Sequence, residues 1–130
     1  MSNTEPCIVY NAIKTPDGTI LESLHIHDYK THLDKNGEEY MVDGGTAYTR
    51  RNSNKEPFEE LTVTTEAPHE VQREYWSWGT YGKNGDQPLR FVKLKDMEHD
   101  HIAAVVNTQR INAARRSAMI KELFYRATNL

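Results

Sequence analysis

Aromatic and basic side chains that suit nucleotide binding cluster in the second half of the sequence. Four aromatic residues directly precede Lys83 and Asn84, namely Tyr75, Trp76, Trp78 and Tyr81. Three arginines follow in a helix-like segment, namely Arg110, Arg115 and Arg116. Aromatic faces stack on a purine, an asparagine amide reads its edge, and a guanidinium binds phosphate at two points. This combination predicts a site for a flat, anionic small molecule.

The same residues also have a purely structural interpretation. The tryptophans could fill a hydrophobic core while the arginines cover a solvated helix face. Arg115 and Arg116 point about 100° apart on a helix, so one ligand need not contact both. The sequence alone leaves both interpretations open.

Histidines in the first third of the chain indicate a second kind of chemistry. His25 and His27 would share one face of an extended strand, beside Asp28. Imidazole and carboxylate groups serve both metal binding and acid–base catalysis. The sequence has neither a second cysteine nor an HExxH helix, so we expect no metal and interpret these histidines as solvated or hydrogen-bonded.

Motifs of common enzyme classes are missing from the sequence. It contains no G-x-S-x-G nucleophile elbow and no Walker-type phosphate loop. Asp43-Gly44-Gly45 would let backbone amides approach a phosphate, although a glycine pair after a strand also forms a bend or bulge. We therefore expect a binding protein with no catalytic residue and no cofactor.

The composition indicates one small domain. The chain has 130 residues, of which 37% are apolar and 27% charged. Its hydrophobic core should therefore be thin, and a thin core favours a homo-oligomer. No apolar run approaches the roughly 20 residues of a membrane span, and residues 1–6 lack an export pattern. We expect a cytoplasmic protein without a membrane partner. Cys7, the lone cysteine, is predicted to be a buried structural thiol.

The charge is unevenly distributed along the chain. Residues 1–70 carry 6 basic and 13 acidic side chains, whereas residues 71–130 carry 10 basic and 6 acidic ones. The acidic first half argues against a nucleic-acid polymer as partner. The basic second half suits either local phosphate contacts or complementarity with the acidic half.

Turn residues and β-type segments predict antiparallel hairpins in the first half. Turns are expected at Thr15–Gly18 and Asp34–Gly37, where glycine supplies a positive φ. The predicted strands span residues 7–12, 19–23, 25–33, 39–42, 48–51 and 61–65.

The last third predicts helices, because apolar residues recur near a 3.6 period and neither Pro nor Gly occurs after Pro88. Weak helix formers predict a break at residues 108–112. The expected fold class is α+β, with an antiparallel β-hairpin-rich N-terminal part followed by C-terminal helices. We expect a single domain over 1–130, made of a β-rich segment (7–66), an aromatic and glycine-rich linker (67–95) and a helical segment (98–127). Within the linker we expect a short helix at 69–76 and, at 91–94, either a short strand or an extended lead into the helices.

Three stretches resemble a small domain that is widespread in bacteriophages and prophages. They are Ile8–Ser23 leading to His27-Asp28-Tyr29, Tyr40–Gly45 with Tyr48 and Arg50-Arg51, and Trp78–Leu89. Some members of that group carry zinc-ribbon cysteines before the VDGG motif. This chain has the turn Lys35-Asn36-Gly37 there instead, so the resemblance implies no zinc.

The whole-length arrangement resembles the first family of Thoeris anti-defence proteins. These are viral sponges that sequester cyclic ADP-ribose signals made by bacterial TIR-domain proteins. The resemblance implies sequestration of a small cyclic nucleotide without cleavage, in the host cytoplasm. It also implies a homo-oligomer, dimer-based and up to a hexamer, with pockets between subunits and a second kind of site for cyclic oligonucleotides.

The resemblance also implies roles for individual residues. An aromatic ring would stack on the adenine, and arginines would take the phosphates. The residues that match these roles are Tyr75, Trp76, Trp78, Asn84, Arg110 and Arg115, with Arg50 and Arg51 for the second site. Two other functions stay open: a nucleotide-processing enzyme that uses His25 and His27, and an inhibitor that blocks a host protein through the aromatic surface.

Overall fold

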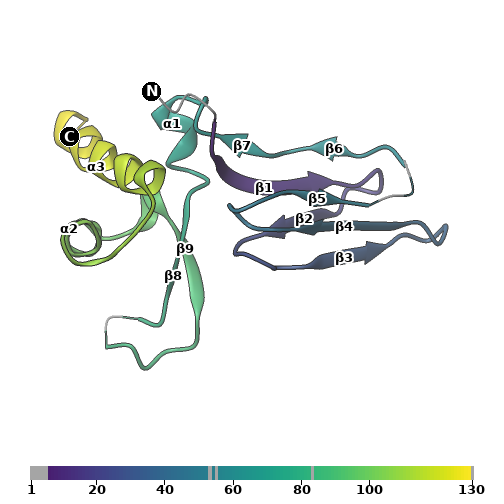
Figure 1. Cartoon of the computed structure of the whole chain (residues 1–130), viewed down its shortest axis with the longest axis horizontal. Coiled ribbons are helices and arrows are strands. Elements are labelled where there is room, and N and C mark those ends of the chain that lie inside the picture. Colours follow the sequence, from purple (N-terminus) through teal and green to yellow (C-terminus); the bar gives the residue numbers. More distant parts are fainter. Residues whose placement is uncertain (1–5, 53, 55, 83, 130) are drawn as a thin grey trace. The chain divides into compact units, whose positions relative to one another are not determined.

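The computed structural model describes residues 6–52, 54, 56–82 and 84–129 (Figure 1). Contacts divide the chain into two compact units, with the division between Glu66 and Ala67. The sequence predicted one domain with an aromatic and glycine-rich linker over residues 67–95. Residues 67–95 fall within the second unit, which spans Ala67–Leu130.

The first unit is made of short antiparallel strands. They are β1 (Ile8–Lys14), β2 (Ile20–Ser23), β3 (Lys30–Leu33), β4 (Glu39–Asp43), β5 (Arg50–Arg51), β6 (Glu59–Glu60) and β7 (Val63–Thr64). One sheet has the order β2-β1-β6, with β7 also paired to β1, and the other has the order β3-β4-β5. The predicted hairpins β1–β2 and β3–β4 are present, with Ile13 opposite Leu21 and His32 opposite Tyr40.

The core of the first unit draws on both sheets. Ile13 and Leu21 from the first sheet pack with Tyr40 and Val42 from β4, and Phe58 covers the cluster. Tyr40 is 1% exposed and Val42 is fully buried. Because these side chains are closely packed, the core fixes the position of β4, which ends at Asp43.

Two expectations for the first unit are wrong. His25 to His27 form a turn rather than the start of a strand, closed by a 3.0 Å hydrogen bond from Asp28 N to His25 O. The Asp28 carboxylate stabilises this turn by accepting a hydrogen bond from Leu24 N. Cys7 is exposed because it lies before β1, outside the part of that strand that enters the core.

The second unit contains a hairpin and helices. Its elements are α1 (His69–Gln72), β8 (Ser77–Thr80), β9 (Arg90–Lys93), the 3-10 helix η1 (Leu94–Asp96), α2 (His99–Thr108) and α3 (Ala113–Thr128). The predicted break between the last two helices is confirmed, and Asn112 caps α3 by accepting a hydrogen bond from Arg115 N. The helix expected over 69–76 ends at Gln72, and Trp78 lies in β8.

A buried carboxylate joins α1 to α3 within the second unit. Glu122 of α3 is fully buried and accepts hydrogen bonds from Arg73, Arg126 and His69, at 2.8 to 2.9 Å. Burial alone would raise the pKa of Glu122, but these hydrogen bonds outweigh it and hold the pKa at about 2. The carboxylate is therefore charged and fully paired at neutral pH.

The two units together confirm the predicted α+β class, with antiparallel strands in the N-terminal part and helices at the C-terminus. Among the described residues, no helix combines the length and the apolar character that crossing a membrane requires.

Candidate functional site

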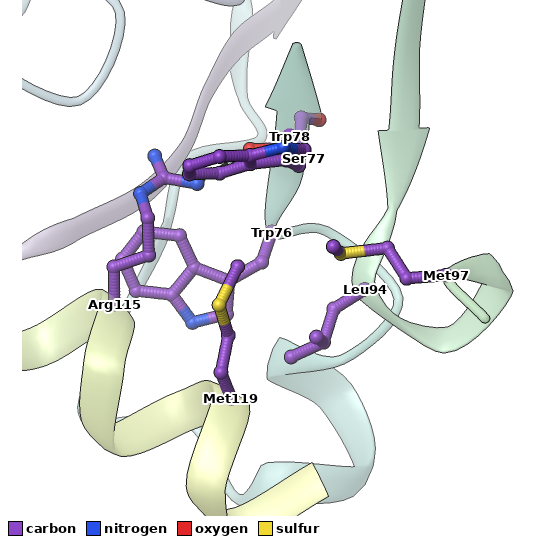
Figure 2. A pocket seen from close by; sticks show the side chains of 7 residues that line it. All are labelled: Trp76, Ser77, Trp78, Leu94, Met97, Arg115 and Met119. Carbon is purple, nitrogen blue, oxygen red and sulfur yellow. Dashed lines mark hydrogen bonds between the residues drawn. The ribbon is translucent and has the colours of Figure 1, made fainter. Parts of the chain in front are cut away.

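A small hollow lies in the second unit, between the start of β8, η1 and α3. Its empty space is about 180 Å³ when the adjoining open solvent is included, and its walls leave no room for a water molecule. Figure 2 shows the side chains that line it, which are Trp76, Ser77, Trp78, Leu94, Met97, Arg115 and Met119. Apart from Ser77 and Arg115 the lining is aromatic, aliphatic or thioether, which suits a flat ring.

Backbone spacing explains why these residues meet. Trp76 and Trp78 are two positions apart, so they share one side of the extended chain at β8. Arg115 and Met119 are four positions apart on α3 and share one helix face. Leu94 N donates to Trp76 O at 2.9 Å, which holds η1 against the start of β8.

Trp76 forms the fixed wall of the hollow. Its indole is 3% exposed, and its Nε1 donates to Gln72 Oε1 at 3.1 Å. Trp78 is only partly buried and therefore presents more of its surface to solvent. The two tryptophans thus differ in role, since one anchors the fold and the other is the more accessible ring.

Arg115 covers the aromatic surface. Its guanidinium carbon lies 4.7 Å from the ring centroid of Trp76 and 6.0 Å from that of Trp78, both within cation–π range. One of its terminal nitrogens donates to the backbone carbonyl of Ser77. Figure 2 shows the side chain rising from α3 past Trp76 toward Trp78.

The charge of Arg115 is not neutralised within the described part of the chain. Its guanidinium contacts the two indoles and the Ser77 carbonyl, and no described carboxylate lies within ion-pair distance. Burial lowers its pKa, because the charged guanidinium is partly removed from water. A buried cation without a carboxylate attracts an anion.

The position of Arg115 in α3 adds to this attraction. Arg115 lies in the first turn of a 16-residue helix whose first turn contains no acidic residue. The positive end of the helix dipole disfavours a cation there and favours an anion. The hollow, the aromatic faces and the positive potential together have the chemistry that a flat, negatively charged group requires.

The structure brings three of the predicted binding residues to this hollow, Trp76, Trp78 and Arg115. Tyr75, Asn84 and Arg110 belong to the same unit but do not line it. Asn84 is exposed in the β8–β9 loop, and Arg110 is exposed between α2 and α3. Lys83, named beside Asn84 in the sequence analysis, lies outside the described residues.

Arg50 and Arg51 lie in β5 of the first unit and make different contacts. Arg51 is bound to Glu60 by hydrogen bonds of 2.6 and 3.1 Å. Arg50 is more exposed, with its guanidinium 3.7 Å from a carboxylate oxygen of Asp43. Arg50 is therefore the more available of the two for a ligand.

A hydrogen-bonded chain of titratable groups lies beside Arg50 in the first unit. His27 Nδ1 is 2.8 Å from Tyr48 Oη, and the Tyr48 hydroxyl donates to Asp43 at 3.3 Å. Burial, together with the nearby Asp43, raises the pKa of Tyr48. His27 has a φ of 63°, an unusual conformation for a residue with a side chain.

The backbone around this chain is tightly fixed. The side-chain Nδ2 of buried Asn11 donates to the backbone carbonyls of Asp43, Gly45 and Tyr48, each at 3.0 Å. A Cβ at Gly44 would lie 1.9 Å from the Tyr48 carbonyl oxygen, so this turn requires glycine. The glycine pair thus permits a close backbone approach, in agreement with the bend interpretation.

No group of three or more metal-ligating side chains occurs among the described histidine, cysteine, aspartate and glutamate residues. The sequence analysis considered His25 and His27 as metal ligands, and both lie in the turn described above. His25 Nε2 is 3.7 Å from Asp28, and His27 contacts Tyr48. The geometry therefore suits proton transfer along the chain of groups more than metal coordination.

Sequence reasoning missed four lining residues of the hollow, Ser77, Leu94, Met97 and Met119. Met119 had a signal, because it follows Arg115 by one helical turn. Leu94 and Met97 had none, since η1 was not predicted and only the packed structure brings it to β8.

Comparisons with protein-family models, with curated proteins and with solved structures found no match.

Proposed function

We propose that this protein is a phage anti-defence protein that binds a small cyclic nucleotide of the cyclic ADP-ribose class and sequesters it without cleavage in the host cytoplasm. The observation that carries the proposal is Arg115, a partly buried guanidinium that lies over two indoles with no described carboxylate partner. A base that stacks on indole and a phosphate that pairs with guanidinium supply what this site lacks.

The lining of the hollow supports binding rather than cleavage. The lining side chains include no carboxylate, imidazole or thiol. The guanidinium of Arg115 keeps its protons at physiological pH and therefore cannot act as a general base. Hydrolysis of a glycosidic or phosphate bond needs a poised acid, base or metal at the reacting atoms. Stacking and charge pairing need none of these.

The size of the hollow supports an oligomer. Its walls leave no room even for a water molecule, whereas typical small-molecule sites measure roughly 300–1,000 Å³. A flat ring could enter only if side chains moved, and the remainder of a cyclic nucleotide would lie outside. We therefore propose a homo-oligomer, dimer-based and up to a hexamer, in which a second subunit completes the site.

Calorimetric titration with cyclic ADP-ribose tests the binding proposal. Wild-type protein should bind it, and Arg115→Gln should weaken binding roughly 10- to 150-fold, because a charge-assisted hydrogen bond is lost. Arg116→Gln is the matched control, since it removes the same charge from the next residue and likewise loses a hydrogen bond to a backbone carbonyl, that of Val106. Equal loss in both variants, or no binding by wild-type protein, would contradict the proposal.

A second candidate function is acid–base chemistry on a nucleotide in the first unit. The His27–Tyr48–Asp43 chain favours it, since a buried carboxylate can orient a hydroxyl, which in turn fixes the tautomer of an imidazole. His27 is exposed and its Nε2 would be the group that meets a substrate. This candidate uses residues distinct from those of the hollow.

Turnover measurements separate the two candidate functions. An enzyme of this kind would convert a cyclic nucleotide with a rate that falls roughly 100-fold or more in His27→Ala, while His32→Ala, a histidine bound to Asp17, would keep its rate. Nucleotide recovered unchanged after long incubation with wild-type protein would eliminate this candidate and leave sequestration standing.

A further inference from the structure

We propose that the Arg115 guanidinium occupies the position that the flat ring of a ligand would take in the hollow. When a ligand binds, its ring displaces the guanidinium from this position. In the structure the guanidinium covers the faces of Trp76 and Trp78. On binding, the ring of the ligand takes that position and the guanidinium turns to the anionic group of the same molecule. This inference rests on the proposed function and concerns how the same site selects its ligand.

The first support is that the aromatic surface is already covered. Trp76 lines the hollow and yet is only 3% exposed, and the Arg115 guanidinium lies over its ring at 4.7 Å. A stacked ring requires about the same separation from the indole as the guanidinium now has. Ring and guanidinium therefore compete for one position.

The second support is that the guanidinium is held by contacts that a ligand can replace. It donates a hydrogen bond to the backbone carbonyl of Ser77, and no carboxylate among the described residues pairs with it. Compare Arg73, which forms two hydrogen bonds with the buried carboxylate of Glu122. Displacement of Arg115 breaks no ion pair, whereas displacement of Arg73 would break one.

The third support is the flexibility of the surroundings. Met97 and Met119 line the same hollow, and methionine side chains adjust to irregular shapes more readily than branched ones. Figure 2 shows Met119 beside the Trp76 indole, on the same helix as Arg115. The hollow can thus reshape around a ring without a change in the backbone.

The consequence is selection for ligands that carry both groups. A neutral ring must displace the guanidinium without offering it a new partner, so it should bind poorly. An anion without a ring pairs with the guanidinium but leaves the indoles uncovered. A molecule with a ring and an adjacent phosphate satisfies the indoles and the guanidinium together, so its two parts bind cooperatively.

Adenosine and ribose 5-phosphate are the probes that test this exchange, with cyclic ADP-ribose as reference. Each is titrated into wild-type protein, Arg115→Ala and the control Arg116→Ala. We expect Arg115→Ala to bind adenosine about 2- to 30-fold more tightly than wild-type protein, because the cation–π contacts no longer compete. The same variant should bind cyclic ADP-ribose and ribose 5-phosphate more weakly. Arg116→Ala should change none of the three.

Weaker or unchanged adenosine binding in Arg115→Ala would overturn the exchange, since it would make the guanidinium a fixed wall. Arg115→Lys serves if the alanine variant does not fold, because lysine keeps the charge but cannot cover the rings as a plane; it too should bind adenosine more tightly. A failure of wild-type protein to bind cyclic ADP-ribose would overturn the proposed function instead, and adenosine binding would still report on the exchange.

Discussion

The guanidinium of Arg115 lies 4.7 Å from the ring centroid of Trp76, and that ring is 3% exposed. The arginine therefore shields the indole from water and keeps its own charge without a described carboxylate partner. A cation in this position depends on aromatic faces and one carbonyl for its stabilisation. The proposed recognition of a charge and of a ring would thus depend on a single contact.

Replacement of Trp78 should weaken nucleotide binding without unfolding the protein. Trp78 lines the hollow and is only partly buried, and loss of one base-stacking ring costs about 1–3 kcal/mol. Trp78→Leu should therefore raise the dissociation constant for cyclic ADP-ribose by roughly 5- to 150-fold in calorimetric titration. Tyr81→Leu is the control, since Tyr81 is 56% exposed and does not line the hollow. A larger effect from Tyr81→Leu would place the stacking ring elsewhere.

Acid should destabilise the second unit through Glu122. The pKa of this carboxyl is about 2 in the folded protein, below its ordinary value of 4.5, because Arg73, Arg126 and His69 donate hydrogen bonds to it. A group with a depressed folded pKa contributes stability above its unfolded pKa, and that contribution disappears as the pH falls from about 4.5 to 2. Denaturant unfolding at pH 7 and at pH 3 should show this loss in wild-type protein.

The substitution Glu122→Gln isolates this carboxylate. Because it leaves Arg73 and Arg126 without their buried partner, it should cost about 3–5 kcal/mol at pH 7. The difference from wild-type protein should shrink toward pH 2. A difference that stays constant between pH 7 and pH 2 would show that the carboxylate is not the acid-sensitive group.

Alanine at Gly44 should destabilise the first unit. Its φ is 110°, and a Cβ there would lie 1.9 Å from the Tyr48 carbonyl oxygen. Such overpacking costs about 1–3 kcal/mol or more, in addition to the cost of positive φ. Gly37→Ala is the matched control, since Gly37 has a φ of 83° but no atom within 4 Å of the added Cβ. In chemical denaturation, Gly44→Ala should unfold at a much lower denaturant concentration than Gly37→Ala. Equal unfolding midpoints would contradict the close approach of the Gly44 and Tyr48 backbones.

Local chemistry predicted much of the fold. The turns at Thr15–Gly18 and Asp34–Gly37 carry residues that favour tight turns, and both hairpins formed there. The break before α3 followed from Asn112, a good cap and a weak helix former. These features depend on a few neighbouring residues, which is why one sequence sufficed.

The rest depends on packing between distant segments. His27 adopts a positive φ because Asp28 and Tyr48 fix the turn around it, and no neighbour in the sequence indicates that conformation. The strand β8 was missed because its glycine disfavours strands, yet Gly79 lets Leu89 and Phe91 lie across it. Trp76, Trp78 and Arg115 were named from their chemistry, whereas their common hollow required η1 and α3 to pack near the start of β8.

The mass spectrum of the small molecules that heat releases from the protein tests the central claim most directly. Purified wild-type protein is incubated with a cyclic ADP-ribose signal, freed of unbound nucleotide and then denatured by heat. The account predicts that the released molecule has the mass of the intact signal and that Arg115→Gln releases far less of it than Arg116→Gln. Release of linear ADP-ribose or of smaller nucleotide fragments, or no retained nucleotide, would contradict it.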